Sequence, residues 1–406
     1  MRRMTSPTAA LLKRKGDVIP LNTCLTIVEC DDARQRLGIT EFEIGNSSEY
    51  GCFHEGSVAY WGQPSTSFHM KEMSAPLNND ENSSRIRCSH KRPQNSSLGP
   101  GVALLMSFPN SGTSYTGALV RSSSSTATAS NYGSANTVNQ RSKTLFDWSP
   151  AGPFLTDPKS SFNDKIDIPK NGTYVLTKTH CGGYCFGCHP KQYIQTQAEF
   201  RDDCLTSDFL DAFGGKQKAM YDASIVDKAL HLVRDPFDNI VSRFHLKRNQ
   251  KKDNSTWLAA YPNSPDGFNK FCAHVNTRLH EAEEKVPVVG AKSNTNVLVK
   301  YREKIPCYSD FVRYVLWHNH AWETIDELGV EQMTLHYENY GSNHKETTSN
   351  LFQFLGLTIE GEGVEFHGSE RYYRGYFTND EIEAVQELVS DIASKETWNL
   401  LSLYFD

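Results

Sequence analysis

The stretch Val102–Tyr115, VALLMSFPNSGTSY, contains the clearest structural signal in the sequence. Its apolar first half, which ends at Phe108, is typical of a strand that is buried on both faces of a sheet. A tight turn around Gly112 follows, and hydroxyl side chains open a helix near Ser111. Because parallel strands are joined by helical crossovers, a buried strand that leads through a short turn into a helix predicts an α/β fold.

Further strands and helices alternate along the C-terminal part of the chain, which predicts a parallel sheet flanked by helices. Strands are expected at 173–178, 229–233 and 333–337, and helices at 236–248, 268–284, 311–328 and 349–355. The last helix is predicted to begin at Thr378, where Glu381 completes a capping box. The polar segment Ser122–Pro169 is predicted to be a long loop or insertion.

The N-terminal part of the chain has a different composition. Residues 1–97 contain four cysteines, two short aromatic stretches and a polar run at 78–97. These features predict a small, Cys-containing, β-rich module followed by a linker. We therefore expect two domains, the module at 1–97 and the α/β domain at 98–406.

The overall charge excludes some classes of partner. The 406-residue chain carries a formal net charge of −6, which argues against nucleic acid as a partner because the phosphate backbone needs a basic surface. No apolar run approaches the roughly 18 residues that span a bilayer. The basic N-terminus is followed by too short an apolar stretch for a signal peptide. We expect neither a transmembrane segment nor an export signal in this chain.

The cysteines and sequons bear on the compartment. Ten cysteines are many for a cytosolic protein, and their even number suggests disulfide pairing in an oxidising compartment. Five N-x-S/T sequons point to a glycoprotein, although a chain this rich in Asn, Ser and Thr has about as many by chance. The balance slightly favours the Golgi lumen or secretory pathway over the cytoplasm.

The turn after the first strand is a candidate anion site. Backbone N–H groups at the start of a helix converge on one point and favour negative charge. Ser111, Thr113 and Ser114 would add hydroxyl donors to the same anion. An ordinary strand–helix turn with a serine cap explains these residues equally well. The turn is not a Walker A loop, because no lysine follows Gly112.

A second candidate site follows the strand expected at 229–233. Arg234 stands at the carboxyl end of this strand, where open α/β sheets place ligands. Ser242 lies about two helical turns further on, and an arginine with a serine hydroxyl suits a terminal phosphate. The alternative is a surface ion pair of Arg234 with Asp235 or Asp238.

A third motif, Lys178-Thr179-His180, also follows a buried strand. His180 is a candidate general base at neutral pH, and Lys178 a candidate cation that stabilises a leaving oxygen. The alternatives are a loop histidine without a ligand and a zinc ligand. The zinc reading rests on four nearby residues, Cys181, Cys185, Cys188 and His189. Their spacing lacks the usual paired-hairpin pattern, so a local disulfide is favoured and no metal is expected.

Taken in order, these three motifs resemble those of the PAPS-dependent sulfotransferases, which use 3′-phosphoadenosine 5′-phosphosulfate (PAPS) as donor. That family shows P-K-S-G-T-T-W after a strand, then K-T-H, then R-x₇-S across a strand–helix junction. The matching stretches here are 109–115, 178–180 and 234–242, with further echoes at 317–322, 335–339 and 351–357. The resemblance covers roughly residues 101–406. It implies a P-loop NTPase-like sulfotransferase fold and a metal-independent sulfuryl transfer.

The resemblance also implies roles for individual residues. The 5′-phosphosulfate would be cradled by Asn110, Ser111, Gly112, Thr113 and Ser114. Tyr115 would pack on the adenine. The 3′-phosphate would be held by Arg234 and Ser242, with Arg374 and Gly375 as a weaker match for a closing loop. His180 would be the general base, with Lys178 beside it.

One position departs from the family pattern. The phosphate-loop lysine, which stabilises charge on the leaving group, is replaced by Asn110. An amide donates a hydrogen bond but carries no positive charge. We hypothesise that Lys178 supplies the missing charge from the end of a neighbouring strand.

The predicted function is therefore transfer of a sulfuryl group from PAPS to a hydroxyl or amine acceptor. A carbohydrate acceptor is favoured if the protein is lumenal, and a small alcohol, phenol or amine if it is cytosolic. Two alternatives stay open. One is a P-loop kinase or nucleotide hydrolase, with Asp235 as the metal-binding acid. The other is a carbohydrate-binding or adhesion protein with a degenerate sulfotransferase domain.

Overall fold

The computed structural model describes residues 18–19, 27–36, 39–46, 51–55, 58–63, 83–85, 100–133, 143–156, 172–182, 195–210, 216–280, 296–368 and 375–405. The chain forms two compact units. Unit 1 comprises Met1–Gly99, Ala129–Asp164 and Leu205–Ile225. Unit 2 comprises Pro100–Thr128, Lys165–Cys204 and Val226–Asp406, and it contains all the candidate site residues.

The described part of unit 1 consists mainly of short strands and the helix α2. A four-stranded sheet has the order β2-β4-β3-β5, with bounds Glu41–Asn46, Val58–Gln63, Gly51–Glu55 and Ser83–Arg85. Helix α2 (Ile27–Arg36) is joined to β3 by the disulfide Cys30–Cys52, and both cysteines are buried. A second sheet has the order β1-β11-β10, with bounds Val18–Ile19, Lys216–Met220 and Thr206–Leu210.

The segment expected to be a long loop contains regular structure in its described part. Helix α3 (Thr113–Ser124) reaches into it, and β7 (Ala129–Ser130) pairs antiparallel with β8 (Phe154–Leu155). These two-residue strands are too short to produce an alternating hydrophobic pattern. The expectation of a loop is therefore wrong for these residues, whereas the alternative, an insertion, agrees with the assignment of Ala129–Asp164 to unit 1.

The sheet of unit 2 contains four parallel strands, β6 (Gly101–Ser107), β9 (Tyr174–Thr179), β12 (Val226–Val233) and β13 (Glu331–His336). Their order is β9-β6-β12-β13. Every residue of β6 is buried, which explains its uninterrupted apolar sequence. The predicted α/β fold with a largely parallel sheet is confirmed.

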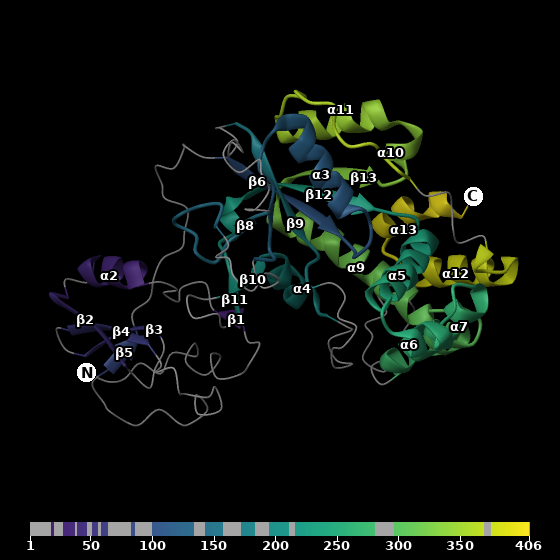
Figure 1. The fold of residues 1–406 in the computed structure, drawn as a ribbon, viewed down its shortest axis with the longest axis horizontal. Coiled ribbons are helices and arrows are strands. Elements are labelled where there is room, and N and C mark those ends of the chain that lie inside the picture. The colour runs from purple at the N-terminus through teal and green to yellow at the C-terminus, as the bar shows by residue number, and fades with distance from the viewer. Residues whose placement is uncertain are drawn as a thin grey trace. The chain divides into compact units, whose positions relative to one another are not determined.

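Helices cover both faces of this sheet (Figure 1). Leu230 and Leu232 pack in a core with α3 and with α11 (His344–Leu355). His231 lies between them in β12, so it points to the opposite face, where its Nε2 lies 2.7 Å from Nδ1 of His318 in α9 (Tyr308–Leu328). Burial lowers the pKa of both imidazoles, which indicates a neutral pair inside the core.

The remaining helices of unit 2 are α4 (Gln197–Cys204), α5 (Pro236–Gln250), α6 (Ser255–Ala260), α7 (Pro265–His280), α8 (Asn296–Arg302), α10 (Asn339–Ser342), α12 (Asn379–Ile392) and α13 (Lys395–Leu401). The capping box at the start of α12 is confirmed, because the Thr378 side chain accepts from the Glu381 N–H. The expectation that this is the last helix is wrong. Helix α13 follows, capped by Ser394, and it is too short to show a clear helical period.

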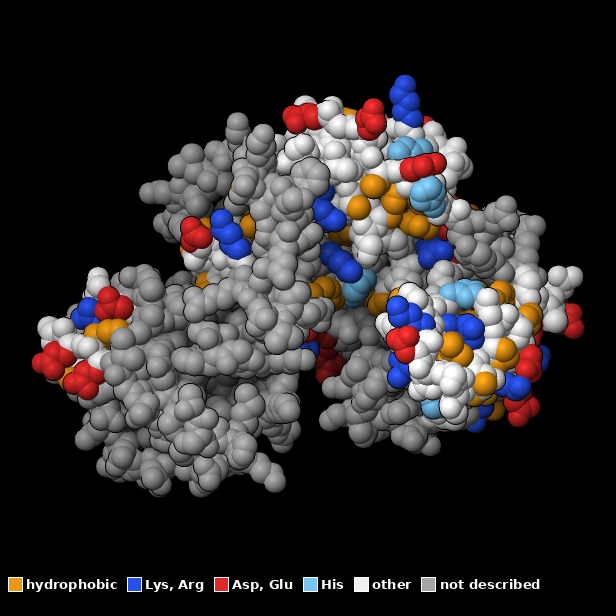
Figure 2. All heavy atoms as spheres, in the orientation of Figure 1, with side chains coloured by type: hydrophobic (Ala, Val, Ile, Leu, Met, Phe, Trp, Pro, Cys, Tyr) orange, Lys and Arg blue, Asp and Glu red, His pale blue; other side chains and the backbone are white. Residues whose placement is uncertain are grey.

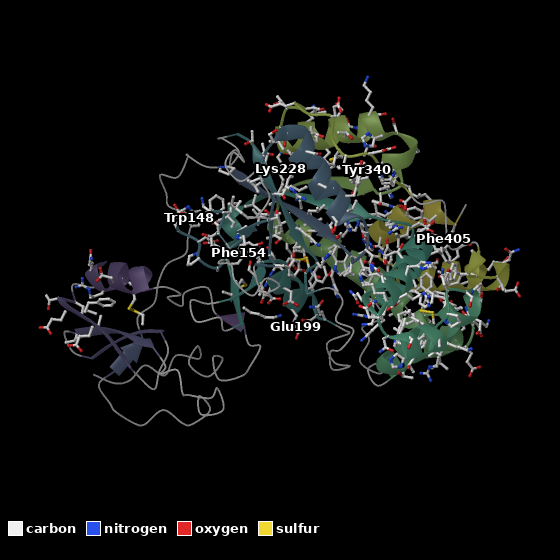
Figure 3. All side chains as sticks on the ribbon, in the orientation of Figure 1. Trp148, Phe154, Glu199, Lys228, Tyr340 and Phe405 are labelled. Atoms are coloured by element: carbon white, nitrogen blue, oxygen red, sulfur yellow. A yellow bond between two sulfur atoms is a disulfide. The ribbon has the colours of Figure 1, made fainter. Side chains whose placement is uncertain are left out.

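Lys228 shows how the sheet accommodates a buried charge (Figure 3). Its Nζ donates to the Phe354 carbonyl at 2.9 Å, lies 2.8 Å from a Glu331 carboxylate oxygen and sits 4.4 Å from the centre of the Tyr174 ring. The ammonium group is therefore paired and hydrogen-bonded, as a buried lysine must be. Lys228 has a structural role in β12.

Two disulfides lie in the described part of unit 2. Cys181 pairs with Cys204, and Cys272 of α7 pairs with Cys307, which directly precedes α9. With Cys30–Cys52, these bonds pair all the cysteines in the described part of the chain. Among the described residues, no helix has both the length and the apolar character needed to cross a bilayer.

Candidate active site

The four parallel strands of unit 2 end at one edge of the sheet. The chain passes from β6 to β9 on one side and then to β12 on the other side of β6. Such a reversal opens a crevice beyond the carboxyl ends of the strands, where open α/β sheets bind ligands. Of the three motifs recognised in the sequence, two directly follow β6 and β12, and Lys178-Thr179-His180 spans the end of β9. Figure 2 shows basic and histidine side chains near the centre of the view, over the strands of this sheet.

The turn after β6 requires glycine at position 112. Gly112 has a φ of 105°, and a Cβ added there would collide with the ring of Tyr337. The helix α3 begins directly afterwards, and no side chain caps it. The first N–H groups of a helix have no acceptor within that helix. Together with the exposed Ser114, these groups form a set of donors suited to an anion.

Asn110 and Arg234 meet at this turn. Asn110 has a φ of 69°, a left-handed conformation that asparagine adopts more readily than lysine. Its carbonyl accepts a hydrogen bond of 2.8 Å from Nη1 of Arg234. The guanidinium group also lies 4.9 Å from the centre of the Tyr337 ring. The side chain at the end of β12 therefore contacts the turn that follows β6.

Asn239 supports the same turn, and sequence reasoning missed it. Its Nδ2 donates to Oγ of Ser111 and to the carbonyl of Pro109, both at 3.0 Å. Asn239 and Ser111 are fully buried. The only signal in the sequence was the position of Asn239 in the first turn of α5, close to Arg234.

Asp235, the metal-binding acid in the kinase alternative, caps the start of α5. Its Oδ1 caps α5 by accepting from the N–H groups of Phe237 and Asp238, at 2.9 and 3.3 Å. Burial, Asp238 and Glu338 raise the pKa of Asp235 to about 8. Because Mg²⁺ prefers ionised carboxylates, a buried acid that is protonated near pH 7 is poorly suited to bind it.

His180 is held at the end of β9. Its Nδ1 lies 2.8 Å from the carbonyl of Ser107, the last residue of β6. Because a carbonyl only accepts, Nδ1 carries the proton, and Nε2 of the neutral ring is unprotonated. Burial and the nearby Lys178 lower the pKa of His180 to about 4. The imidazole is therefore neutral at physiological pH, in the tautomer that a general base needs at Nε2.

Lys178 lies two residues before His180 in β9, where it is paired in register with Leu105 of β6. Its side chain is partly buried, and this burial lowers its pKa. Lys178 thus lies in β9, and His180 follows the end of this strand, which is the neighbour of β6.

Tyr115 belongs to an aromatic cluster. Its ring centre lies 4.9 Å from the ring centres of both Tyr340 and Phe366, and its hydroxyl lies 2.8 Å from Nε2 of His344. Tyr340 is labelled in Figure 3. Burial raises the pKa of Tyr115. These contacts orient the ring, and its stacking on adenine stays a prediction.

The other expected phosphate ligands are further from the turn along the chain. Ser242 is partly buried in α5, about 9 Å along the helix axis from Pro236. Gly375 is exposed, with open space where a Cβ would stand. Arg374 lies outside the described residues. Contacts of these three residues with a nucleotide stay predictions.

Two aromatic residues of α9 support the strand ends. The Tyr314 hydroxyl donates to the carbonyl of Arg234, and the Trp317 Nε1 donates to the carbonyl of His180 at 2.9 Å. Their ring centres lie 5.2 and 6.4 Å from that of Phe108. The sequence shows both residues three positions apart on a buried helix, but sequence reasoning assigned them no role.

The zinc alternative loses one of its ligands. Cys181 is bonded to Cys204 of α4, 23 residues away, and a disulfide sulfur is not a thiolate ligand. Cys185, Cys188 and His189 lie outside the described residues. Within the described part of the chain, no group of three or more His, Cys, Asp or Glu side chains is arranged to bind a metal ion.

We predict that Gly112→Ala destabilises the protein more than Gly329→Ala. Both glycines have a positive φ, but only Gly112 faces a ring that a methyl group would strike. Overpacking should add about 1–3 kcal/mol to the backbone cost shared by both variants. Urea unfolding curves of the two variants measure the difference. Equal losses of stability would contradict the close approach of Tyr337.

Comparison with known proteins gives one family match. Residues 217–374 match the sulfotransferase domain. This segment includes Arg234 and Ser242. It does not include the turn at 108–115 or His180, because both lie before residue 217. No curated protein matches the chain.

The solved structures that align with the chain include two sulfotransferases. The crystal structure of a sulfotransferase from Alicyclobacillus acidocaldarius has a TM-score of 0.36 and 12% identity, and covers 76% of this chain and 99% of that chain. Mouse sulfotransferase SULT7A1 complexed with PAP has a TM-score of 0.31 and 14% identity, and covers 75% of this chain and 89% of that chain. The family match confirms the resemblance to sulfotransferases, and it covers residues 217–374.

Proposed function

We propose that the protein is a sulfotransferase that transfers the sulfuryl group of PAPS to a hydroxyl or amine of an acceptor. The family match over residues 217–374 supports this reaction class. The observation that carries the proposal is the hydrogen bond from Arg234 to the carbonyl of Asn110, at 2.8 Å. It joins the proposed binding regions for the two ends of one bisphosphorylated nucleotide.

The available donors fit the anionic groups of PAPS. The uncapped start of α3 and the hydroxyls of Ser111, Thr113 and Ser114 suit the 5′-phosphosulfate. The planar fork of Arg234 suits the 3′-phosphate, with Ser242 and the Arg374-Gly375 pair as further ligands. Tyr115 supplies an aromatic ring for the adenine.

His180 and Lys178 supply the chemistry in this proposal. Nε2 of His180 accepts the proton of the acceptor hydroxyl or amine as that oxygen or nitrogen forms its bond to sulfur. The bond between sulfur and the bridging 5′-phosphate oxygen breaks, and its electron pair leaves on that oxygen. The products are the sulfated acceptor and 3′-phosphoadenosine 5′-phosphate (PAP). Lys178 stabilises the developing charge in place of the lysine that Asn110 replaces.

The disulfides bear on the acceptor and the compartment. Three disulfides in the described residues fit an oxidising environment such as the secretory pathway, because the cytosol keeps most thiols reduced. A lumenal enzyme would meet glycans, so a carbohydrate hydroxyl is the favoured acceptor.

We predict that Arg234→Ala weakens PAP binding. Loss of hydrogen bonds from a charged group costs about 1.5–3 kcal/mol, which corresponds to roughly a 10- to 150-fold rise in Kd. Isothermal titration calorimetry with PAP gives the affinity, and circular dichroism checks the fold. Arg201→Ala is the matched control, because Arg201 is 40% exposed and pairs with Glu327 on the surface. An unchanged Kd for Arg234→Ala would refute its assignment to the 3′-phosphate.

We predict that Lys178→Ala lowers turnover while the affinity for PAP changes little. Removal of one charge-stabilising donor typically slows catalysis by about 10²- to 10³-fold. Transfer from ³⁵S-labelled PAPS to pooled glycans, phenols and amines is the assay, with the exposed Lys270→Ala as control. Wild-type turnover by Lys178→Ala would eliminate this role. Glycan binding by the wild type without any transfer would instead favour the non-enzymatic alternative.

The pKa of His180 sets the expected pH dependence. A base with a pKa of about 4 stays neutral above that pH, so its protonation should not lower kcat between pH 7.5 and 5. Steady-state rates across this range, with circular dichroism at each pH, make the measurement. A decline in kcat centred near the ordinary histidine value of about 6.5 would contradict the buried environment described for His180.

A further inference from the structure

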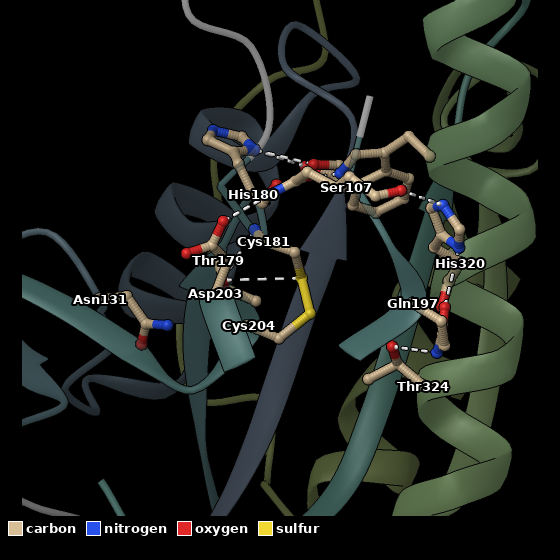
Figure 4. The surroundings of a disulfide bond; sticks show 12 residues. Ser107, Asn131, Thr179, His180, Cys181, Gln197, Asp203, Cys204, His320 and Thr324 are labelled. Atoms are coloured by element: carbon tan, nitrogen blue, oxygen red, sulfur yellow. Dashed lines mark hydrogen bonds between the residues drawn. A yellow bond between two sulfur atoms is a disulfide. The ribbon is translucent and has the colours of Figure 1, made fainter. Parts of the chain in front are cut away.

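The residue that follows the proposed base is bonded to a neighbouring helix. Cys181 comes directly after His180, and its disulfide to Cys204 links the end of β9 to the last residue of α4 (Figure 4). Both cysteines are fully buried. Cys181 also donates its N–H to Oγ1 of Thr179, at 3.1 Å. The residue directly after His180 is therefore covalently attached to α4.

The backbone at Cys181 and Gly182 is in the left-handed region. Cys181 has a φ of 48°, and Gly182 has a φ of 68°. Left-handed geometry is unfavourable for a residue with a Cβ, so the contacts around Cys181 must hold it. A Cβ at Gly182 would collide with Asp203 of α4, which shows how closely the strand end approaches that helix.

Helix α4 is in turn fixed to α9. The Gln197 side chain lies 2.8 Å from Nδ1 of His320 and 3.1 Å from Oγ1 of Thr324, as Figure 4 shows. Phe200, three residues along α4, packs edge-on against Trp317, with ring centres 5.5 Å apart. Gln197 and Phe200 are three residues apart, so they lie on the same face of α4. The disulfide therefore links residue 181 to a helix that is packed along α9.

Trp317 of α9 contacts both α4 and the end of β9. The ring of Trp317 contacts Phe200, and its Nε1 donates to the carbonyl of His180 at 2.9 Å. On the other side, the His180 imidazole is bonded to the carbonyl of Ser107. The proposed base is thus attached to β6 by its ring, to α9 by its carbonyl and to α4 by the next residue.

We propose that the Cys181–Cys204 disulfide, with α4 packed on α9, is a positioning device for His180. The disulfide takes no part in the chemistry. It keeps the end of β9 in place, so that the imidazole is held in line with the acceptor proton. This inference rests on the proposed sulfuryl transfer, and it adds residues that act through His180 and not on the substrate.

The Cys272–Cys307 disulfide of unit 2 is a matched control. Cys272 and Cys307 are also buried, and their bond closes a loop of similar length, with a separation of 35 residues against 23. Loss of either bond should therefore reduce stability by comparable amounts. Neither Cys272 nor Cys307 is next to a proposed site residue. We therefore expect only the loss of the Cys181–Cys204 bond to lower kcat beyond its effect on stability.

The experiment compares Cys181→Ser/Cys204→Ser with Cys272→Ser/Cys307→Ser, at a temperature where both remain folded. We expect kcat with ³⁵S-labelled PAPS and the pooled acceptors to fall roughly 10- to 100-fold in the first variant, as for a misplaced catalytic group. The KM for PAPS and the Kd for PAP should stay within about twofold, because His180 contributes to the chemical step and not to donor binding. The second variant should keep its kcat. Unchanged kcat in the first variant, or equal losses in both, would overturn the proposal.

Amide hydrogen exchange adds a readout that does not depend on turnover. We expect the peptide covering 178–182 to exchange faster in the first variant only, since the disulfide no longer holds the strand end. Unchanged protection there would overturn the positioning role even if activity fell. A wild-type protein that transfers no sulfuryl group would instead overturn the proposed function, while the exchange data would still decide whether the disulfide holds His180 in place.

Discussion

The hydrogen bond between the Arg234 guanidinium and the Asn110 carbonyl is the contact on which the proposed site depends. It exists because β6 and β12 are neighbours in a parallel sheet, so their carboxyl ends emerge side by side. The ring of Tyr337, at the end of the next strand, lies against both Gly112 and the guanidinium group. A single set of strand ends thereby brings together the start of a helix and an arginine, which are two common means of binding anions.

Helix α9 is the common support behind these strand ends. Its Tyr314 bonds to the backbone of Arg234, and its Trp317 bonds to the backbone of His180. Both rings pack against Phe108, which begins the turn after β6. The buried face of one helix therefore sets the relative positions of all three motifs. This arrangement explains why the helix is rich in large side chains with polar tips, which fill the core and still bond to the backbone.

The elements that the sequence predicted well are those with a strong local pattern. Three buried strands follow from apolar runs, and the capping box of α12 follows from Thr378 and Glu381. Short elements such as β7, β8 and α13 have too few residues for a period to show. In the candidate site, the motif residues were recognisable, but their supports were not. Asn239, Ser107 and the partner of Cys181 are fixed by contacts between distant segments, which no local pattern contains.

A crystal structure with bound PAP is the most direct measurement of where the nucleotide lies. We expect the 5′-phosphate at the start of α3, within hydrogen-bond distance of backbone N–H groups of residues 111–114, and the 3′-phosphate against Arg234. The ribose would bridge the crevice between the ends of β6 and β12. A nucleotide bound at another edge of the sheet, or one whose two phosphates contacted neither α3 nor Arg234, would contradict this expectation.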